Sequence, residues 1–219
     1  MPFGLKNVLY EFIRIVAQLL EACEDFAVLY LDDIAVFSAS FQNHIKHLET
    51  VLRKVQLVGL TIKPSKCRFA ESLIQYLGHV VGQGCRRPSE LKIEAVVNFP
   101  TPRTKIEIRA FLGLAGYYSH YIPMFSSVAA PLTDTLKGKC RKGSEKWTED
   151  CEKAFGSLKQ ALASKPVLHS PDYNRPFILQ TDGSDNGMGV VLSQITGDNQ
   201  EHTIIYLSRK FSEGEKILR

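Results

Sequence analysis

Apolar residues recur along this chain at two different spacings, which predict helices in some stretches and strands in others. Near the start the apolar residues recur at intervals of three and four, as on one face of an amphipathic helix: Phe12, Ile15, Val16, Leu19 and Leu20. Two continuous apolar runs, 26–29 and 34–37, then flank a short polar segment, which is the pattern of a β-hairpin with a tight turn.

The next stretch returns to helical spacing. Ser40 can cap a helix whose apolar stripe contains Ile45, Leu48, Leu52 and Val55. We expect this helix to end near Gly59 and the chain to enter a strand at 60–62. Residues 73–81 form a second strand region that ends at two glycines, Gly82 and Gly84.

The middle of the chain is predicted to be helical. Thr104 and Glu107 form a capping box, in which each side chain satisfies a free amide at the helix start. We expect one further helix over 125–136 and another that opens at Thr148.

The last part of the chain returns to strands, which we expect at 177–182, 187–193 and 203–207. The chain thus combines helices and strands, and we expect an α+β fold.

Composition changes this picture only locally. The chain has 219 residues, 44% of them apolar, which is ordinary for a globular protein that buries a core. Residues 46–109 contain twelve Lys/Arg against five Glu and no Asp. A basic segment suits a polyanion such as nucleic acid, although basic residues on amphipathic helices also serve as a solvated face.

Other composition signals point away from several protein classes. The five cysteines include no CxxC pair, which favours free thiols in a reducing compartment. His44 and His47 share one helix face, but no third metal ligand is near them in sequence, so a solvated surface is the simpler interpretation. We find no signal peptide and no apolar run that could cross a membrane, and expect an intracellular protein of unknown compartment.

The strongest chemical signal is the segment Tyr30-Leu31-Asp32-Asp33 between the two apolar runs. Adjacent carboxylates repel each other, and divalent cations would remove that cost because Mg²⁺ prefers hard oxygen ligands. Two metals on such carboxylates can clamp the attacking and leaving oxygens of a phosphoryl transfer. The alternative is a solvated Asp-Asp turn.

A second acidic signal is Asp182, which ends a predicted strand and precedes Gly183 and Ser184. It is a candidate metal-binding carboxylate of a nuclease. Two alternatives remain: an Asx-turn between strands, and a calcium loop of the EF-hand type, whose twelfth position is here Ser193 instead of Glu.

Together these segments resemble the pol polyprotein of gypsy-type LTR retrotransposons, over essentially the whole chain. The matching segments, in order, are Met1–Asn7, Tyr30–Asp33 (the YxDD of the palm), Tyr76–His79 (the primer grip), Phe99–Pro102 with Phe111–Tyr118 (the thumb), Trp147–Lys159 (the bridge to the nuclease) and Thr181–Ser184 (the first strand of RNase H).

This resemblance implies a domain order. Residues 1–84 would be the C-terminal part of a reverse transcriptase palm, a hairpin plus helices. Residues 85–145 would be a thumb-like helical region and 146–172 the connection. Residues 173–219 would be the N-terminal part of an RNase H-like mixed sheet.

The resemblance also implies roles. Asp32, Asp33 and Asp182 would be catalytic and metal-binding, with Mg²⁺ as cofactor. Four residues would lie near the nucleotide and template: Pro2, Phe3, Gly4 and Tyr30. The primer grip would be Tyr76, Leu77, Gly78 and His79. Three arginines would contact the nucleic-acid backbone: Arg86, Arg87 and Arg103. The partners would be an RNA/DNA template–primer duplex and the remainder of the polyprotein.

The chain also departs from the family pattern. The family's polymerase site needs a third carboxylate on an earlier palm strand, and its nuclease needs a Glu that would follow Arg219. We therefore expect a fragment of an RNA-directed DNA polymerase and RNase H that is inactive as an isolated chain. By family it would be an enzyme, but the sequence leaves open whether this chain acts as one. The alternative is a non-catalytic remnant of a mobile element that binds nucleic acid or protein.

Overall fold

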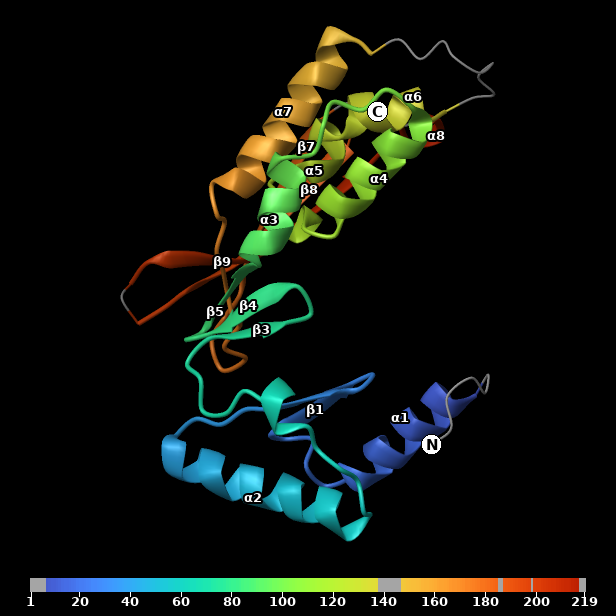
Figure 1. Cartoon of the computed structure of the whole chain (residues 1–219). Helices are drawn as coiled ribbons and strands as arrows, with labels where there is room; N and C mark the ends of the chain where they lie inside the picture. Colours follow the sequence, from blue (N-terminus) through green and yellow to red (C-terminus); the bar gives the residue numbers. More distant parts are fainter. Residues whose placement is uncertain (1–6, 138–146, 185–186, 198, 217–219) are drawn as a thin grey trace. The chain divides into compact units, whose positions relative to one another are not determined.

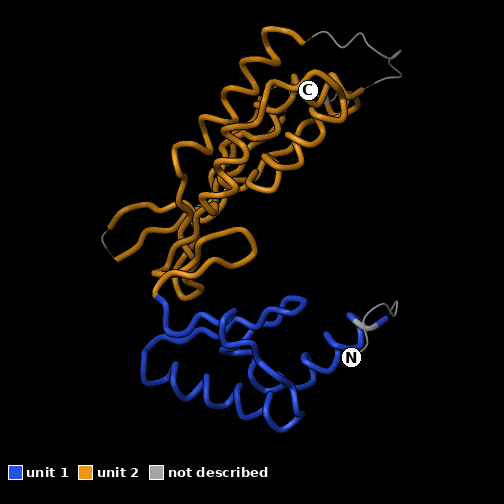
Figure 2. The backbone as a smooth tube through the Cα atoms, viewed as in Figure 1, with its two compact units in different colours: residues 1–71 blue, residues 72–219 orange. Residues whose placement is uncertain are grey.

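The structure, a computed structural model, describes residues 7–137, 147–184, 187–197 and 199–216. It divides into two compact units, residues 1–71 (unit 1) and residues 72–219 (unit 2), which Figure 2 distinguishes by colour.

The described part of unit 1 combines two α-helices with a β-hairpin (Figure 1). Its elements, in chain order, are α1 (Val8–Leu19), β1 (Ala27–Tyr30), β2 (Asp33–Val36), α2 (Phe41–Leu57) and the short 3₁₀ helix η1 (Pro64–Lys66). Strands β1 and β2 are antiparallel, and they pair from Ala27↔Val36 to Tyr30↔Asp33. The predicted hairpin and both predicted helices are confirmed.

The core of unit 1 is small. Its buried residues are Val16, Leu20, Cys23, Ala27, Val51 and Val55. Lys54 adds a polar tie, since its ammonium donates hydrogen bonds to the carbonyl oxygens of Leu19 and Glu21, at 3.0 and 2.6 Å.

The prediction of a strand at 60–62 is wrong. Helix α2 ends at Leu57, Gly59 adopts a φ of +68°, and the chain then continues without strand pairing. Leu60 instead donates its amide hydrogen to the Val55 carbonyl and packs against the core of unit 1. An apolar run becomes a strand only when a neighbour supplies a ladder of hydrogen bonds.

Unit 2 begins with a four-stranded sheet of order β3-β4-β5-β6. Its strands are β3 (Ile74–Tyr76), β4 (His79–Gly82), β5 (Cys85–Pro88) and β6 (Leu168–His169). All neighbours are antiparallel. Strand β6 joins the sheet across a long stretch of sequence, because Arg86 pairs with Leu168.

The helices of unit 2 bury its main core. They are α3 (Glu90–Val97), α4 (Lys105–Gly116), η2 (Ser119–Tyr121), α5 (Phe125–Val128), α6 (Ala130–Thr135), α7 (Glu149–Ala163) and α8 (Glu213–Lys216). The fully buried side chains at the centre include Phe111, Tyr118, Leu132, Leu158 and Leu162. Aromatic pairs add to this packing, such as Phe111 with Phe155 at a centroid distance of 4.5 Å.

One predicted helix is broken in two. Residues 125–136 form α5 and α6 instead of a single helix. Pro131 stands in the first turn of α6, where its missing amide hydrogen costs nothing, whereas the same residue would disrupt a helix interior.

Unit 2 ends with a three-stranded antiparallel sheet of order β7-β8-β9: β7 (Ile178–Ser184), β8 (Gly187–Ile195) and β9 (Glu201–Lys210). Ser126 of α5 holds β9 through its amide and hydroxyl, which donate to the Ser208 hydroxyl and carbonyl at 2.8 and 2.9 Å. Gly189 of β8 makes room for Met124, because a Cβ there would overlap the methionine sulfur.

The predicted caps are present. The Ser40 and Thr148 side chains accept hydrogen bonds from the amides of Asn43 and Cys151, and Thr104 forms a complete capping box with Glu107. The α+β prediction is confirmed. In the described part of the chain, no helix has the length and apolar character needed to span a bilayer.

Candidate functional site

The aspartate doublet lies at the tip of the hairpin in unit 1. Tyr30 and Asp33 pair across the strands, so Leu31 and Asp32 form a two-residue turn. Leu31 adopts a φ of +55°, a region that is unfavourable for a branched side chain. Both aspartates are exposed, and the half-exposed Tyr30 precedes them. The predicted turn is confirmed, and its carboxylates are accessible to solvent and to ions.

The doublet supplies only two of the ligands that a divalent cation takes. Carboxylate oxygens suit Mg²⁺, so the chemistry of the two side chains fits two ligands of such an ion. Among the described residues, however, no group of three or more His, Cys, Asp or Glu side chains could hold a metal ion. Any tighter site would need a further ligand from outside the described residues.

The histidines on α2 have a structural explanation. The Nδ1 atoms of His44 and His47 lie 3.3 and 2.7 Å from the Ser38 hydroxyl, just after β2. The His47 ring also stacks on Phe26 at 4.0 Å. These contacts connect the end of the hairpin to α2. Both rings are partly buried, so they do not lie on the solvated helix surface that the sequence predicted.

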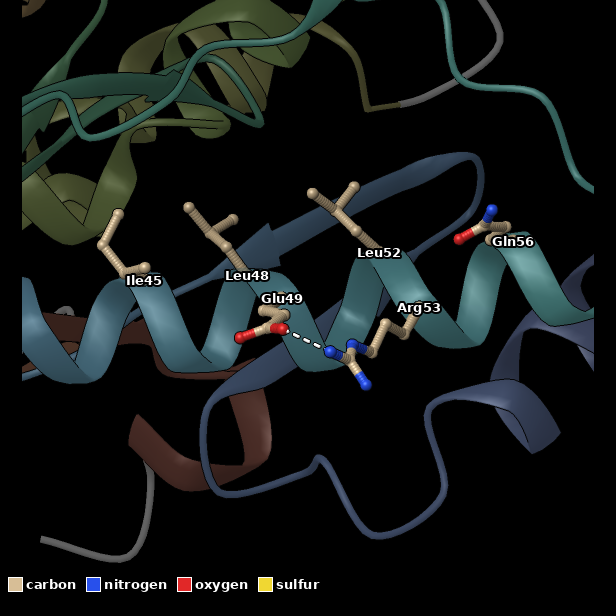
Figure 3. A pocket seen from close by; sticks show the side chains of 6 residues that line it. All are labelled: Ile45, Leu48, Glu49, Leu52, Arg53 and Gln56. Atoms are coloured by element: carbon tan, nitrogen blue, oxygen red, sulfur yellow. Dashed lines mark hydrogen bonds and ion pairs between the residues drawn. The ribbon is translucent and has the colours of Figure 1, made fainter.

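A shallow groove runs along another face of α2 (Figure 3). Ile45, Leu48 and Leu52 point to the same side of the helix, and Gln56 continues the row. Glu49 and Arg53 flank it and pair with each other at 2.7 Å. Neither aspartate of the doublet lines this groove.

A second hairpin, in unit 2, carries the residues predicted to form the primer grip. Tyr76 and His79 pair across β3 and β4, and Leu77 and Gly78 form the turn. His79 is enclosed by aromatic rings: Tyr117 and Tyr121 stack on it, and Tyr118 meets it edge-on, all at centroid distances of 5.4 to 5.6 Å. Its Nδ1 lies 2.9 Å from the Tyr121 hydroxyl.

The electrostatics of this aromatic box favour neutral side chains. Burial lowers the pKa of His79, and the charges of Arg86 and His120 lower it further. Burial also raises the pKa of Tyr121 to about 12. At neutral pH His79 is therefore an uncharged imidazole, and the Tyr121 phenol keeps its proton.

The tyrosines of this box are the functional candidates that the sequence analysis missed. The sequence predicted Tyr117 and Tyr118 only as part of the thumb segment Phe111–Tyr118, and it gave Tyr121 no role. Three tyrosines within five residues, 117–121, were a signal, because buried phenol hydroxyls need hydrogen-bond partners. Their partners lie some 40 residues away, at the hairpin turn.

The three predicted backbone-binding arginines differ in their surroundings. Arg87 and Arg103 are exposed. Arg86 is half-buried, donates to the Ile204 carbonyl at 3.3 Å and lies over the Tyr121 ring at 6.0 Å. Arg86 therefore has a packing role within unit 2 that the other two lack.

Asp182 lies exposed on β7, opposite Gly189 of β8. Ser184 ends β7, and its hydroxyl donates to the carbonyl of Gly187, where β8 begins. Strands lie on both sides of this segment instead of the helices of an EF-hand, so the calcium-loop alternative is not supported.

The predicted site residues thus fall into two groups. The doublet and Tyr30 belong to unit 1, whereas the second hairpin, the arginines and Asp182 belong to unit 2. Pro2, Phe3 and Gly4 lie outside the described residues.

Two family comparisons cover both ends of the chain. Residues 1–81 match the family described as reverse transcriptase (RNA-dependent DNA polymerase). Residues 147–218 match the RNase H-like domain found in reverse transcriptase.

Curated relatives align along almost the entire chain. The Pol polyprotein from transposon 297 of Drosophila melanogaster is 35% identical over 98% of this chain, and that from transposon gypsy of the same organism is 33% identical over 99%. The transposon Tf2-3 polyprotein of Schizosaccharomyces pombe is 34% identical over 98%. The chain spans only 20%, 21% and 16% of the lengths of these three relatives.

Solved structures share the fold. A foamy viral protease–reverse transcriptase in complex with double-stranded DNA matches 98% of this chain and 37% of its own length, with a TM-score of 0.86 and 23% identity. The same viral protein in complex with an RNA/DNA hybrid matches 99% of this chain and 29% of its own, with a TM-score of 0.80 and 23% identity.

Proposed function

We propose that this chain serves RNA-directed DNA synthesis and RNA-strand cleavage by binding a template–primer duplex. It belongs with the retrotransposon Pol polyproteins and contains reverse transcriptase and RNase H-like domain segments. The observation that carries this proposal is the exposed Asp32–Asp33 doublet on a hairpin tip inside the matched reverse transcriptase segment. The remainder of the polyprotein would be its covalent partner.

We assign the doublet to metal binding. Asp32 and Asp33 would contribute carboxylate oxygens to Mg²⁺, and Tyr30, with Pro2, Phe3 and Gly4, would lie near the nucleotide and template. Bound Mg²⁺ would activate the attacking oxygen and stabilise the leaving group of nucleotidyl transfer. Asp182 would supply one carboxylate to the nuclease.

We assign duplex binding to unit 2. Tyr76–His79 would hold the primer end, and Arg87 and Arg103 would contact phosphates without reading sequence. Arg86 is the weaker candidate for a phosphate contact, because its guanidinium already donates to the Ile204 carbonyl and lies over the Tyr121 ring. The domain boundaries 1–84, 85–145, 146–172 and 173–219 remain a proposal.

Duplex binding is tested by fluorescence anisotropy with a labelled RNA/DNA hybrid over a range of salt concentrations. Replacing both Arg87 and Arg103 with Ala should weaken binding equally for different sequences and reduce the salt slope by about 1 for each arginine lost. Arg53→Ala is the matched control, since this exposed arginine of α2 has no proposed phosphate contact. Equal salt slopes for all three proteins would refute the assignment of these arginines.

Primer extension separates the two functional candidates. Because the described residues contain no three-ligand group for a metal, we expect no nucleotide incorporation by the isolated chain with Mg²⁺. Duplex binding without incorporation favours a binding role for this chain, with catalysis dependent on a further carboxylate. Incorporation that Asp32→Asn or Asp33→Asn abolishes would show a complete polymerase site instead.

A further inference from the structure

The turn at Leu77–Gly78 is held from outside its own hairpin. Leu77 and Gly78 have φ values of +48° and +74°. A two-residue turn with both central residues at positive φ fits the twist of a hairpin, but leucine is a poor residue for that region. Such a turn persists when the surrounding structure stabilises it.

Two tyrosine hydroxyls supply that stabilisation. Tyr117 donates to the Leu77 carbonyl at 2.6 Å, and Tyr118 donates to the Gly78 carbonyl at 2.7 Å. The Ser89 amide donates to the same Gly78 carbonyl at 3.0 Å. Both carbonyls of the turn are therefore held by donors that flank helices elsewhere in the chain.

The contact depends on the glycine. A Cβ at residue 78 would lie 3.3 Å from the Tyr118 hydroxyl, which is tighter than most Cβ contacts, and 3.4 Å from the Tyr117 ring. Tyr118 is fully buried, whereas Tyr117 is 55% exposed. One hydroxyl thus belongs to a buried side chain and the other to an exposed side chain.

The next residue is held as well. The His79 ring stacks between Tyr117 and Tyr121, and its Nδ1 lies within hydrogen-bond distance of the Tyr121 hydroxyl. Each of the three consecutive hairpin residues 77–79 therefore lies within hydrogen-bond distance of a different tyrosine hydroxyl.

We propose that Tyr117 and Tyr118 are positioning residues, whose hydroxyls fix the direction of the Leu77–Gly78 turn so that it presents a rigid surface to the recessed 3′ end of a primer. This inference rests on the proposed duplex binding. It adds that the geometry of the hairpin tip is set by residues 117–121, the turn after α4 together with η2, and that loosening this contact would affect a primer end more than a duplex without one.

The test uses Tyr117→Phe, Tyr118→Phe and the double variant, which remove the hydroxyls and keep the rings. Tyr173→Phe is the control, because Tyr173 is 83% exposed and its ring lies 6.2 Å from that of Phe177, away from the turn at 77–78 in sequence. Two DNA duplexes of equal length are compared by fluorescence anisotropy, one with a recessed primer end and one with blunt ends. Hydrogen exchange is followed at 77–80 and in α7.

We expect each hydroxyl removal to speed exchange at 77–80 by about fivefold, the usual effect of one hydrogen bond, with α7 unchanged. The wild type should prefer the recessed duplex, and the double variant should lose that preference while retaining blunt-duplex affinity. If Tyr118→Phe disturbs α7, the more exposed Tyr117→Phe carries the test alone.

The failures are distinguishable. No duplex binding by the wild type would overturn the proposed function and this inference with it. Duplex binding by the wild type, with unchanged preference and unchanged exchange at 77–80 in the variants, would overturn the inference alone.

Discussion

Tyr30–Asp33 in unit 1 and Tyr76–His79 in unit 2 are hairpin tips with the same beginning, Tyr-Leu, and each places its leucine at positive φ. The surroundings of the two tips differ. Tyrosine hydroxyls hold both turn carbonyls of the second hairpin, whereas the residues of the first turn are exposed to solvent. Similar local sequences thus produce two-residue turns with very different degrees of support, and only the second turn has both central residues at positive φ.

The difference extends to the sheets and cores behind the tips. The first hairpin is a two-stranded sheet over the small core of unit 1, and the second belongs to a four-stranded sheet beside the larger core of unit 2. Two isolated strands are marginally stable in water. The comparison indicates that the proposed duplex-binding tip is rigid and that the carboxylate tip is weakly supported.

The largest expected effect comes from truncating the two cores. Phe111→Ala, at a fully buried site in unit 2, should lower the free energy of unfolding of that unit by about 3–5 kcal/mol. Val51→Ala in unit 1 removes a smaller side chain from a smaller core and should cost less. Denaturant titration with residue-resolved hydrogen exchange measures both.

The same exchange experiment tests the comparison directly in the wild type. Residues 106–136 should be protected more strongly than residues 28–37, because the former contribute to the larger core. Stronger protection at 28–37 would reverse the proposed ranking of the two units.

The next effect concerns the tight packing of unit 2. Gly189→Ala places a Cβ against the Met124 side chain and should cost about 1–3 kcal/mol, an ordinary range for overpacking. Gly113→Ala in α4 is the matched control, since its Cβ meets no atom within 4 Å and alanine favours helix. Thermal unfolding would reveal the contrast, and equal melting temperatures for both variants would show that unit 2 is looser than described.

A smaller effect is expected from pH at the supported tip. The pKa of His79 lies below its ordinary value of 6.5 because of burial, Arg86 and His120. The unfolded chain therefore binds a proton more readily, so stability is complete above about pH 6.5 and falls as pH decreases toward the folded pKa. In urea titrations, the free energy of unfolding of the wild type should fall more between pH 7.5 and pH 5 than that of His79→Gln. Parallel pH profiles would contradict this account.

The smallest effect concerns the weakly supported tip. Asparagine tolerates positive φ better than leucine, so Leu31→Asn should stabilise the first hairpin by up to about 1 kcal/mol. Leu77→Asn should gain less, because Leu77 is half-buried in a turn that is already held. Exchange rates at 28–36 and at 74–82 report the two gains, and a larger gain at Leu77 would break the comparison.

The sequence alone was sufficient for features that depend on near neighbours. The caps at Ser40, Thr104 and Thr148 join residues three apart, and the doublet turn joins two adjacent apolar runs. The break before α6 also had a local signal, Pro131, although one continuous helix was predicted there. Such features are readable because their partners lie within one helical turn or one hairpin.

Only the tertiary structure decided which distant segments meet. Residues 60–62 were predicted to be a strand but pair with no neighbouring strand, whereas Leu168 of β6 pairs with Arg86 of β5. The Tyr117 and Tyr118 hydroxyls donate hydrogen bonds to the turn at 77–78, which lies 40 residues earlier in the sequence. Strand pairing and buried hydrogen bonds depend on the position of a partner in space, and the pattern of apolar residues along a chain does not contain that position.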